Sequence, residues 1–467
     1  MKILCFSINP LYPELITGGA SKHLTRLSHH LTVKGHEVTI LCAEDPKGQA
    51  PFELGHNIRV EPLLHFHQPF PQPYAIAPGE LALIYDTVSR FLSDADRFYI
   101  HDGELLLPRN FTQVPVITSF RDNIYPESVL GSFLTQADGI IAVSEYSAEV
   151  LKASAGRMLA GLSKRVQVIP NGIDPAVFSP AGTQPIRAKL GLSDDDWPIV
   201  LHPHRPEAGK GLASTLAVAE LLVYKYGFDR LKVLAPNWVE SMEGHQEDAF
   251  YQEIHRQIAT RGLNDHVLLH PWLSQAEMAG YYSLGDVNLC LGEFVEAFGN
   301  VAYESQVCGT PAIVSRSGTH RTQLPDDLIF KVDPGDITQA AELAAEIIKG
   351  RKRVSQDARE EILRRFSLEK QLLSYESIIS GCEKRAPLDY QQPGWQKGGS
   401  FKLAPWCFMT QGRIYHDYKN RYFTARDIEG LDQLVMALGK SVSTDGEELP
   451  GQLLARCQAE SLVVPVD

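Results

Sequence analysis

The first forty residues contain the pattern that most restricts the fold of this chain. Residues 3–8 form a short apolar run, and a second apolar run follows at 37–41. Between them lie a Gly18-Gly19 turn and a segment whose leucines recur every three or four residues. This order predicts a strand, a helix and a second strand. Two strands joined through a helix pair in parallel, so we expect the chain to begin with a parallel α/β sheet.

The same alternation recurs along the chain and divides it into two halves of similar size. A polar, proline-containing stretch separates the last strand-like run of the first half from the first run of the second. Domains usually have about 100–200 residues, so we expect two α/β domains, at 1–185 and 186–383. A linker rich in Pro, Gly and Gln is expected at 384–400, followed by a small winged-helix-like α+β module at 401–467.

Charge and composition exclude several classes of protein. Lysine and arginine total 44 against 57 aspartate and glutamate, which gives a net charge of −13. An acidic chain is a poor partner for nucleic acid. No apolar run approaches the ~18 residues of a membrane-spanning helix, and the seven cysteines lack zinc-like spacing. We expect a cytoplasmic protein with reduced cysteines, no metal, no nucleic-acid partner and no integral membrane segment. The sequence does not indicate its oligomeric state.

The loop after a predicted strand at 287–291 carries the most informative residues. Glu296 lies in this loop, Gly299 follows it, and Glu304 comes about two turns into the helix that the loop opens. Glycine allows a ligand to approach the backbone closely, and free N–H groups at a helix start attract anions. Two carboxylates separated in this way are suited to hold hydroxyls at the two ends of one polyol. In isolation, such a pair is more often two solvated glutamates.

Two cations follow the strand predicted at 198–203. Arg205 and Lys210 lie five residues apart across a glycine-containing turn at the carboxyl end of that strand. Arginine offers a planar fork and lysine a point charge, and the two together suit a diphosphate. The segment lacks the G-x-x-x-x-G-K-[ST] pattern of a P-loop. The alternative interpretation is an exposed charged turn.

The first half of the chain holds three weaker candidates. Gly18-Gly19 in the first crossover is suited to place backbone N–H groups against a phosphate, although a tight turn explains it equally well. His101 ends a predicted strand, where it is suited to hydrogen-bond a reacting sugar or to satisfy the core. The Pro- and His-rich stretch 44–80 is expected to be a long irregular binding loop.

Taken in order, these motifs resemble the family-4 retaining glycosyltransferases of GT-B fold, over about residues 1–382. The resemblance implies two Rossmann-like domains whose parallel sheets face each other across a cleft. It also implies transfer of a sugar from a nucleotide-diphosphate sugar to an acceptor hydroxyl, with retained anomeric configuration and without a metal. The motifs that carry it are Gly18-Gly19-Ala20, Gly35-His36-Glu37-Val38-Thr39, Ile141-Ala142-Val143-Ser144-Glu145, Val168-Ile169-Pro170-Asn171-Gly172-Ile173-Asp174, Arg205…Lys210-Gly211, Glu296-Ala297-Phe298-Gly299…Glu304 and Cys308-Gly309-Thr310-Pro311.

The resemblance further implies a role for each motif residue. The two cations bind the donor diphosphate and stabilise the leaving group, while the two glutamates hold the donor sugar and the ribose. Catalytic roles are implied for His101, Glu296, Arg205 and Lys210, and contacts to the nucleotide-sugar donor for Gly18, Gly19, Arg205, Lys210, Glu296, Ala297, Phe298, Gly299 and Glu304.

Three departures from the family pattern leave the donor sugar open. His204 stands where a glycine is usual before the arginine, and Ser317-Gly318-Thr319-His320 replaces a Gly-Gly pair with a following Glu. Ser119-Phe120-Arg121 lacks a histidine that is often seen after that strand. Other GT-B activities, a sugar phosphorylase or a sugar-nucleotide epimerase, remain as alternatives. So does a catalytically silent scaffold or binding protein of this fold.

The tail at 401–467 lies outside that resemblance. Residues 413–424 predict a β-hairpin, amphipathic helices follow near 427–438 and 448–459, and 462–464 predict a final strand. The unit resembles the PqqD-like winged-helix elements that recognise peptides in ribosomal-peptide modification. The acceptor therefore stays open between a saccharide, a small molecule, and a peptide or protein bound through the tail. An appendage for oligomerisation or stability is the alternative.

Overall fold

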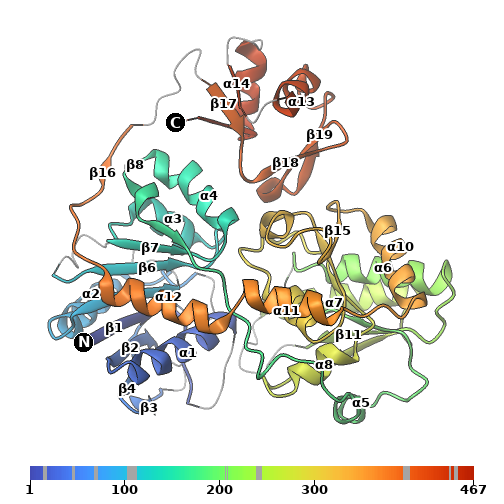
Figure 1. The fold of residues 1–467 in the computed structure, drawn as a ribbon, viewed down its shortest axis with the longest axis horizontal. Coiled ribbons are helices and arrows are strands. Elements are labelled where there is room, and N and C mark those ends of the chain that lie inside the picture. The colour runs from blue at the N-terminus through green and yellow to red at the C-terminus, as the bar shows by residue number, and fades with distance from the viewer. Residues whose placement is uncertain are drawn as a thin grey trace. The chain divides into compact units, whose positions relative to one another are not determined.

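The computed structural model describes residues 1–13, 18–44, 48–67, 72–102, 113–205, 207, 209–237, 245–392, 400–440, 443–445 and 451–466. Figure 1 shows the fold. Its contacts group the chain into two compact units. Unit 1 comprises Met1–Ile169 and Leu372–Asp467, and unit 2 comprises Pro170–Gln371. The segment boundaries proposed from the sequence stay a prediction.

Unit 1 is built on an eight-stranded sheet of order β3-β4-β2-β1-β5-β6-β7-β9. Every neighbouring pair is parallel except β3–β4. Ile3 of β1 pairs with Val38 of β2, which confirms the parallel start predicted from the first forty residues. The strands are β1 (Lys2–Ser7), β2 (Glu37–Ala43), β3 (Phe52–Gly55), β4 (Ile58–Leu64), β5 (Arg97–Asp102), β6 (Val116–Phe120), β7 (Gly139–Ala142) and β9 (Val166–Val168).

Helices cover both faces of this sheet, because its strands are apolar on both sides. In β1, Leu4 belongs to one buried cluster and Ile3 to another. The cluster around Ile3 includes Leu27 of α1 and Tyr375 of α12, so α12 packs on the sheet of unit 1. Outside the tail, the helices of unit 1 are α1 (Gly19–Val33), α2 (Pro78–Leu92), α3 (Pro126–Leu134), α4 (Glu145–Ala153) and most of α12 (Leu368–Gly381).

The prediction of an irregular loop over 44–80 is wrong for its middle part. Strands β3 and β4 lie there and form a hairpin through a turn at Asn57, whose φ is +58°. Pro62 lies within β4, opposite Cys42 of β2, and the register shifts at this point. A proline usually argues against an interior strand, and it therefore masked β4 in the sequence. Residues 45–47 and 68–71 of this stretch lie outside the described residues.

Unit 2 holds a six-stranded, wholly parallel sheet of order β12-β11-β10-β13-β14-β15. The order reverses at β10, and ligands of open α/β sheets bind at the carboxyl ends of strands next to such a point. Its strands are β10 (Ile199–Leu201), β11 (Lys232–Pro236), β12 (Val267–His270), β13 (Val287–Cys290), β14 (Ala312–Ser315) and β15 (Phe330–Val332). Its helices are α5 (Gln184–Lys189), α6 (Leu212–Tyr224), α7 (His245–Thr260), α8 (Met278–Leu284), α9 (Asn300–Val307), α10 (Ile337–Lys349) and α11 (Gln356–Arg365).

The segment predicted as a linker lies partly against unit 1. Asp389–Tyr390 form β16, which pairs antiparallel with β8 (Leu159–Ala160). Leu388 is buried in the core of unit 1. Residues 393–399, the other part of the predicted linker, lie outside the described residues.

The tail has its own small core and mostly confirms its predicted elements. The predicted hairpin is β19–β20, and its turn passes through Asn420 with φ +46°. Phe401, Leu434 and Cys457 belong to one buried cluster. The tail elements are β17 (Ser400–Leu403), β18 (Cys407–Thr410), β19 (Arg413–His416), β20 (Arg421–Phe423), α13 (Leu431–Lys440), β21 (Ser443–Asp445), α14 (Gly451–Ala459) and β22 (Val463–Pro465). Strands β17, β18 and β21 were not predicted.

The tail docks on α4 through a buried polar contact. The hydroxyl of Tyr146 donates a hydrogen bond to Asp417 Oδ2 at 2.8 Å. Both residues are buried, and Ala153 at the end of α4 packs against the tail core. A buried hydrogen bond to a carboxylate is among the stronger polar contacts. The tail and α4 therefore form one packed body.

Candidate donor-binding site

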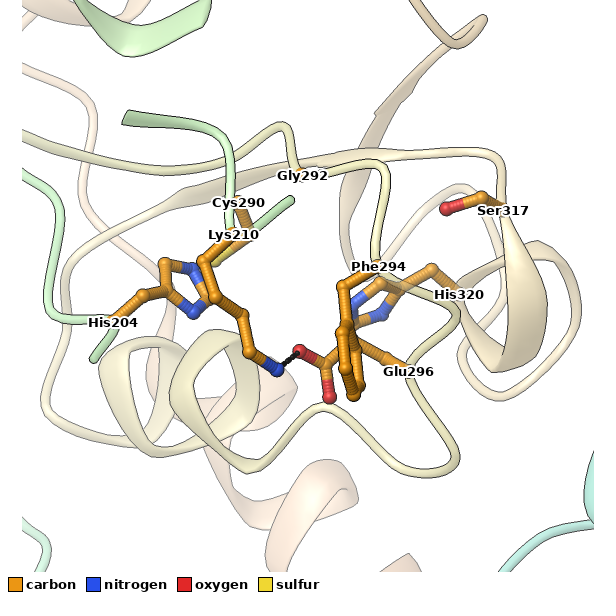
Figure 2. A pocket seen from close by; sticks show the side chains of 8 residues that line it. All are labelled: His204, Lys210, Cys290, Gly292, Phe294, Glu296, Ser317 and His320. Atoms are coloured by element: carbon orange, nitrogen blue, oxygen red, sulfur yellow. Dashed lines mark hydrogen bonds and ion pairs between the residues drawn. The ribbon is translucent and has the colours of Figure 1, made fainter. Parts of the chain in front are cut away.

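A pocket in unit 2 lies where three neighbouring parallel strands end. The loop after β10 contributes His204 and Lys210, the loop after β13 contributes Phe294 and Glu296, and the turn after β14 contributes His320. Cys290, Gly292 and Ser317 complete the lining. Figure 2 shows these side chains around the Lys210–Glu296 pair. The structure thus brings together two predicted motifs that are 86 residues apart in the chain.

An ion pair occupies the centre of this pocket. Lys210 Nζ lies 2.7 Å from Glu296 Oε1, and the two side chains are 10% and 23% exposed. The same ammonium group lies 3.4 Å from the ring centroid of Phe294, a cation–π contact. Burial alone would raise the pKa of Glu296, but the Lys210 charge and hydrogen bond hold that pKa below its usual value. The pocket therefore holds a fixed cation beside an ionised carboxylate.

Arg205 is placed near the pair. Its Nε lies 3.1 Å from Glu207 Oε1, and the two side chains are about a third and a quarter exposed. The Arg205 charge also contributes to the lowered pKa of Glu296. The predicted cation pair is therefore present at the carboxyl end of β10, with Lys210 buried and Arg205 nearer to solvent.

The loop that follows Glu296 enters α9 through Gly299. Gly299 has φ +85°, and a Cβ there would lie 2.2 Å from Cε1 of His320. Ala297 and Phe298 are buried, and the Phe298 ring packs edge-on against Tyr303. In the segment 297–299, the backbone is therefore better placed than the side chains to contact a ligand.

Glu304 lies within α9 and is half-buried. It accepts a hydrogen bond from the Tyr282 hydroxyl at 3.1 Å. Burial raises the pKa of Tyr282, and the Glu304 charge raises it further, so the tyrosine remains a donor. This hydrogen bond therefore holds one oxygen of the Glu304 carboxylate in place.

Two glycines hold the Lys210 loop against the Glu296 loop. A Cβ on Gly211 would lie 2.6 Å from the backbone N of Gly292, and a Cβ on Gly292 would lie 2.6 Å from the carbonyl oxygen of Gly209. Both distances are shorter than real Cβ contacts allow. The backbones of the two loops therefore touch directly, which sets the separation of Lys210 and Glu296.

Sequence reasoning did not assign His204, Phe294, Ser317 or His320 to the site. His204 and His320 were noticed only as departures from the family pattern. His320 Nδ1 lies 3.3 Å from the Tyr303 hydroxyl, and its neighbour Thr319 donates its N–H to the Glu296 carbonyl at 3.2 Å. The signal that would have found them is strand order, because β14 neighbours β13 and their following turns meet.

In unit 1, His101 is built into the core. It is 1% exposed, its Nε2 lies 2.9 Å from the Ala20 carbonyl and its Nδ1 lies 2.9 Å from the Tyr99 hydroxyl. A carbonyl only accepts, so Nε2 carries the proton and Nδ1 accepts from Tyr99. Burial, helped by the Arg121 charge, lowers the pKa of His101 well below its usual range. Both nitrogens therefore have partners within unit 1, and the proposed catalytic role of His101 stays a prediction.

His101 contacts the start of α1, where Gly18 is the N-cap and Gly19 the first helical residue. Its partner Ala20 follows Gly18 and Gly19 directly, so the predicted N-terminal site residues lie together. Gly18 is extended and accepts a hydrogen bond from Ser21 Oγ at 3.1 Å. A Cβ on Gly18 would meet no atom of the described residues within 4 Å.

Unit 1 also carries an open pocket of about 410 Å³. It lies after the carboxyl ends of β2 and β4, where Glu44 and His65 face each other with Oε1 and Nδ1 2.8 Å apart. Glu80 of α2 lines it as well, and its carboxylate accepts the Ala77 N–H at 2.8 Å. Its lining comprises Glu44, His65, Phe66, His67, Ala75, Ile76, Ala77 and Glu80, which include neither lysine nor arginine.

The described residues contain no cluster of three or more His, Cys, Asp or Glu side chains placed to hold a metal ion. In the same described part of the chain, no helix has both the length and the apolar character to cross a membrane.

Both halves of the chain match glycosyltransferase family models. Residues 17–177 match the model described as Glycosyltransferase Family 4, and residues 183–362 match the one described as Glycosyl transferases group 1. These matches place residues 17–177 and 183–362 in two glycosyltransferase families, and together with the two parallel α/β units they indicate the GT-B fold. The matched ranges end before the tail, so its likeness to a peptide-recognition element stays a prediction.

Relatives and solved structures agree with this class. The chain is 29% identical over 203 residues to a D-inositol 3-phosphate glycosyltransferase of Xylanimonas cellulosilytica, covering 41% of this chain and 44% of the relative. A protein of the same name from Kineococcus radiotolerans is 31% identical over 166 residues, covering 35% and 37%. The chain thus spans less than half the length of these curated relatives.

The fold is similar to that of solved structures. Sucrose-phosphate synthase from Thermosynechococcus elongatus has a TM-score of 0.68 at 19% identity, covering 82% of this chain and 99% of the other. Anabaena HepE in complex with UDP-glucose has a TM-score of 0.63 at 18% identity, covering 82% and 100%. At such identities the likeness establishes the GT-B fold.

Proposed function

We propose that this chain transfers a sugar from a nucleotide-diphosphate sugar to an acceptor hydroxyl, with UDP as the nucleotide, with retention and without a metal. The observation that carries the proposal is the buried Lys210–Glu296 pair at the carboxyl ends of β10 and β13. Lys210 is suited to meet the negative charge of a diphosphate, and Glu296 to accept from sugar hydroxyls. UDP is proposed because HepE was solved with UDP and with UDP-glucose.

In this proposal, Lys210 and Arg205 take the place of a metal. As the bond between the sugar and the diphosphate breaks, negative charge develops on the leaving phosphate oxygens, and fixed cations stabilise it. Positive charge develops on the sugar ring, next to the ionised Glu296. The acceptor oxygen attacks the same face of the sugar carbon from which the diphosphate departs, and its proton passes to that diphosphate, so the configuration is retained. Glu304 holds the ribose hydroxyls, and its half-buried position on α9 suits that contact.

Ligand binding by the purified full chain tests the donor assignment. We expect UDP and one UDP-sugar to raise the melting temperature of the wild type by several degrees at about 100 Kd, with EDTA present. Glu304→Ala and Arg205→Ala are expected to lose most of this shift, because each removes a charged hydrogen-bonding group. Glu342→Ala changes an exposed glutamate of α10 and should respond as the wild type does.

Absence of any shift with UDP-, GDP-, ADP- and dTDP-sugars in the wild type would contradict the proposal. Stabilisation by inorganic phosphate with a sugar, but by no nucleotide, would favour the phosphorylase alternative. Tight donor binding without turnover of any acceptor would favour the silent scaffold.

The acceptor is proposed to be an uncharged polyol that binds in the pocket of unit 1. The described residues that line the pocket include two carboxylates and two histidines but neither lysine nor arginine, so their charge favours hydroxyls over phosphate. The named relatives act on D-inositol 3-phosphate according to their titles. We therefore expect transfer to inositol or a simple saccharide to exceed transfer to inositol 3-phosphate at least about tenfold.

Product formation with radiolabelled donor decides between these acceptors. Glu44→Lys is expected to lower transfer to the neutral acceptor and to reduce the ratio of transfer to the neutral acceptor over transfer to inositol 3-phosphate. Glu53→Lys provides the matched exposed control. Preference for the phosphate ester would overturn the acceptor proposal and leave the donor site untouched. Transfer to peptides alone would favour recognition through the tail instead.

A further inference from the structure

His204 is an unusual residue for the place that it occupies. It precedes Arg205, where the family pattern has a glycine, and its ring lines the same pocket as Lys210 and Glu296. The residue is 9% exposed, and its Nε2 has no hydrogen-bond partner among the described residues. A buried polar atom without a partner is costly, so an unpartnered nitrogen in a binding pocket points to a ligand.

The surroundings of His204 keep its ring neutral. Burial, with the Lys210 and His320 charges, lowers the pKa of His204 to about 3. A neutral imidazole adds no charge for a diphosphate to meet, and Lys210 and Arg205 already supply that charge. What the ring offers is one directional hydrogen bond and its own volume.

The ring also limits the room beside the ion pair. In Figure 2, His204 and His320 lie on opposite sides of Lys210 and Glu296. The free volume left in the pocket is about 10 Å³, about what one water needs. A glycine in place of His204 would leave that side of the pocket open.

We propose that His204 determines which donor sugar the chain accepts. It does so through a hydrogen bond between its Nε2 and a sugar hydroxyl, and through the space that its ring fills. This inference rests on the proposed function, because it places the sugar of a nucleotide sugar beside Glu296. It assigns discrimination among sugars to a side chain that the family pattern lacks, and it leaves recognition of the nucleotide to other residues.

Calorimetric titration of the full chain with UDP and with UDP-glucose, UDP-galactose and UDP-N-acetylglucosamine tests this inference. The quantity compared is the ratio of the Kd for UDP to the Kd for each UDP-sugar. In the wild type we expect one sugar to be favoured. In His204→Gly we expect this ratio to fall roughly 3- to 10-fold for the favoured sugar, the effect of one hydrogen bond, and the three sugars to become similar.

Two further variants separate recognition from folding. His204→Gln keeps a polar group near the position of Nε2 and is expected to retain most of the preference. His255→Gln makes the same change on the exposed face of α7 and should match the wild type. Melting temperatures establish that each variant is folded.

The outcomes distinguish this inference from the proposed function. A wild type that binds no nucleotide sugar overturns the proposed function itself. A wild type that discriminates among sugars, with unchanged ratios in His204→Gly, overturns the role of His204 alone. An equal loss of affinity for UDP and for UDP-sugars would place the contact on the diphosphate, and it would likewise overturn a role in sugar choice.

Discussion

Replacing Lys210 by methionine is expected to lower kcat/KM for the donor by about 10²–10³-fold, the usual cost of removing one group that stabilises transition-state charge. Lys210 is the buried cation of the donor pocket, 2.7 Å from Glu296 and against the face of Phe294. Methionine keeps much of the packing volume but removes the charge. Glu296 then loses the partner that holds its pKa down, so its pKa rises.

Donor turnover of the purified variant, measured with the acceptor or as slow donor hydrolysis, checks this expectation. Lys225→Met is a matched control, because Lys225 also pairs with a glutamate and lies over an aromatic ring but is half exposed. Exposed pairs contribute about 0–1 kcal/mol, so we expect less than about a twofold change there. If the two substitutions lowered kcat/KM equally, Lys210 would have no catalytic role.

Replacing Gly211 by alanine is expected to lower the free energy of unfolding of unit 2 by about 2–5 kcal/mol, the sum of backbone strain and overpacking. Gly211 has φ +89°, which alanine adopts at a cost. The added Cβ would also lie 2.6–2.8 Å from backbone atoms of Gly292 and Leu291, which cannot swing aside as a side chain does. Any relief separates the Lys210 loop from the Glu296 loop, so donor affinity should fall as well.

Gly335→Ala isolates the contribution of the backbone angle. Gly335 has φ +79°, but a Cβ there would meet nothing within 4 Å. Its substitution should therefore cost only about 1–2 kcal/mol and leave donor affinity unchanged. Thermal unfolding and UDP titration of both variants make the comparison. A Gly211→Ala protein as stable as Gly335→Ala would show that the loops do not need their direct contact.

Much of the fold was readable because burial leaves a local mark on the sequence. Short apolar runs such as 3–8 and 37–41 became neighbouring parallel strands, since both of their faces are covered. The misses occur where a local rule is overridden. Strand β4 tolerates Pro62 next to a register shift, and β18 in the tail was not singled out.

The candidate site was predictable in its parts and not in its assembly. Lys210 and Glu296 were each predicted as site residues, but their ion pair depends on β10 lying next to β13. The order of strands in a sheet cannot be predicted from local sequence. His204 and His320 entered the pocket for the same reason. His101 was singled out as a site residue, but both of its ring nitrogens have partners within unit 1. The sequence around a histidine at a strand end does not reveal such partners.

The hydrogen bond between Tyr146 and Asp417 changes how the tail is to be regarded. A module joined only by a linker samples a volume, and the local concentration of anything it holds falls as the linker lengthens. The tail is instead fixed to α4 by a buried polar bond and by packing at Ala153. Any molecule bound to the tail would therefore be held at a constant distance and orientation relative to the rest of unit 1.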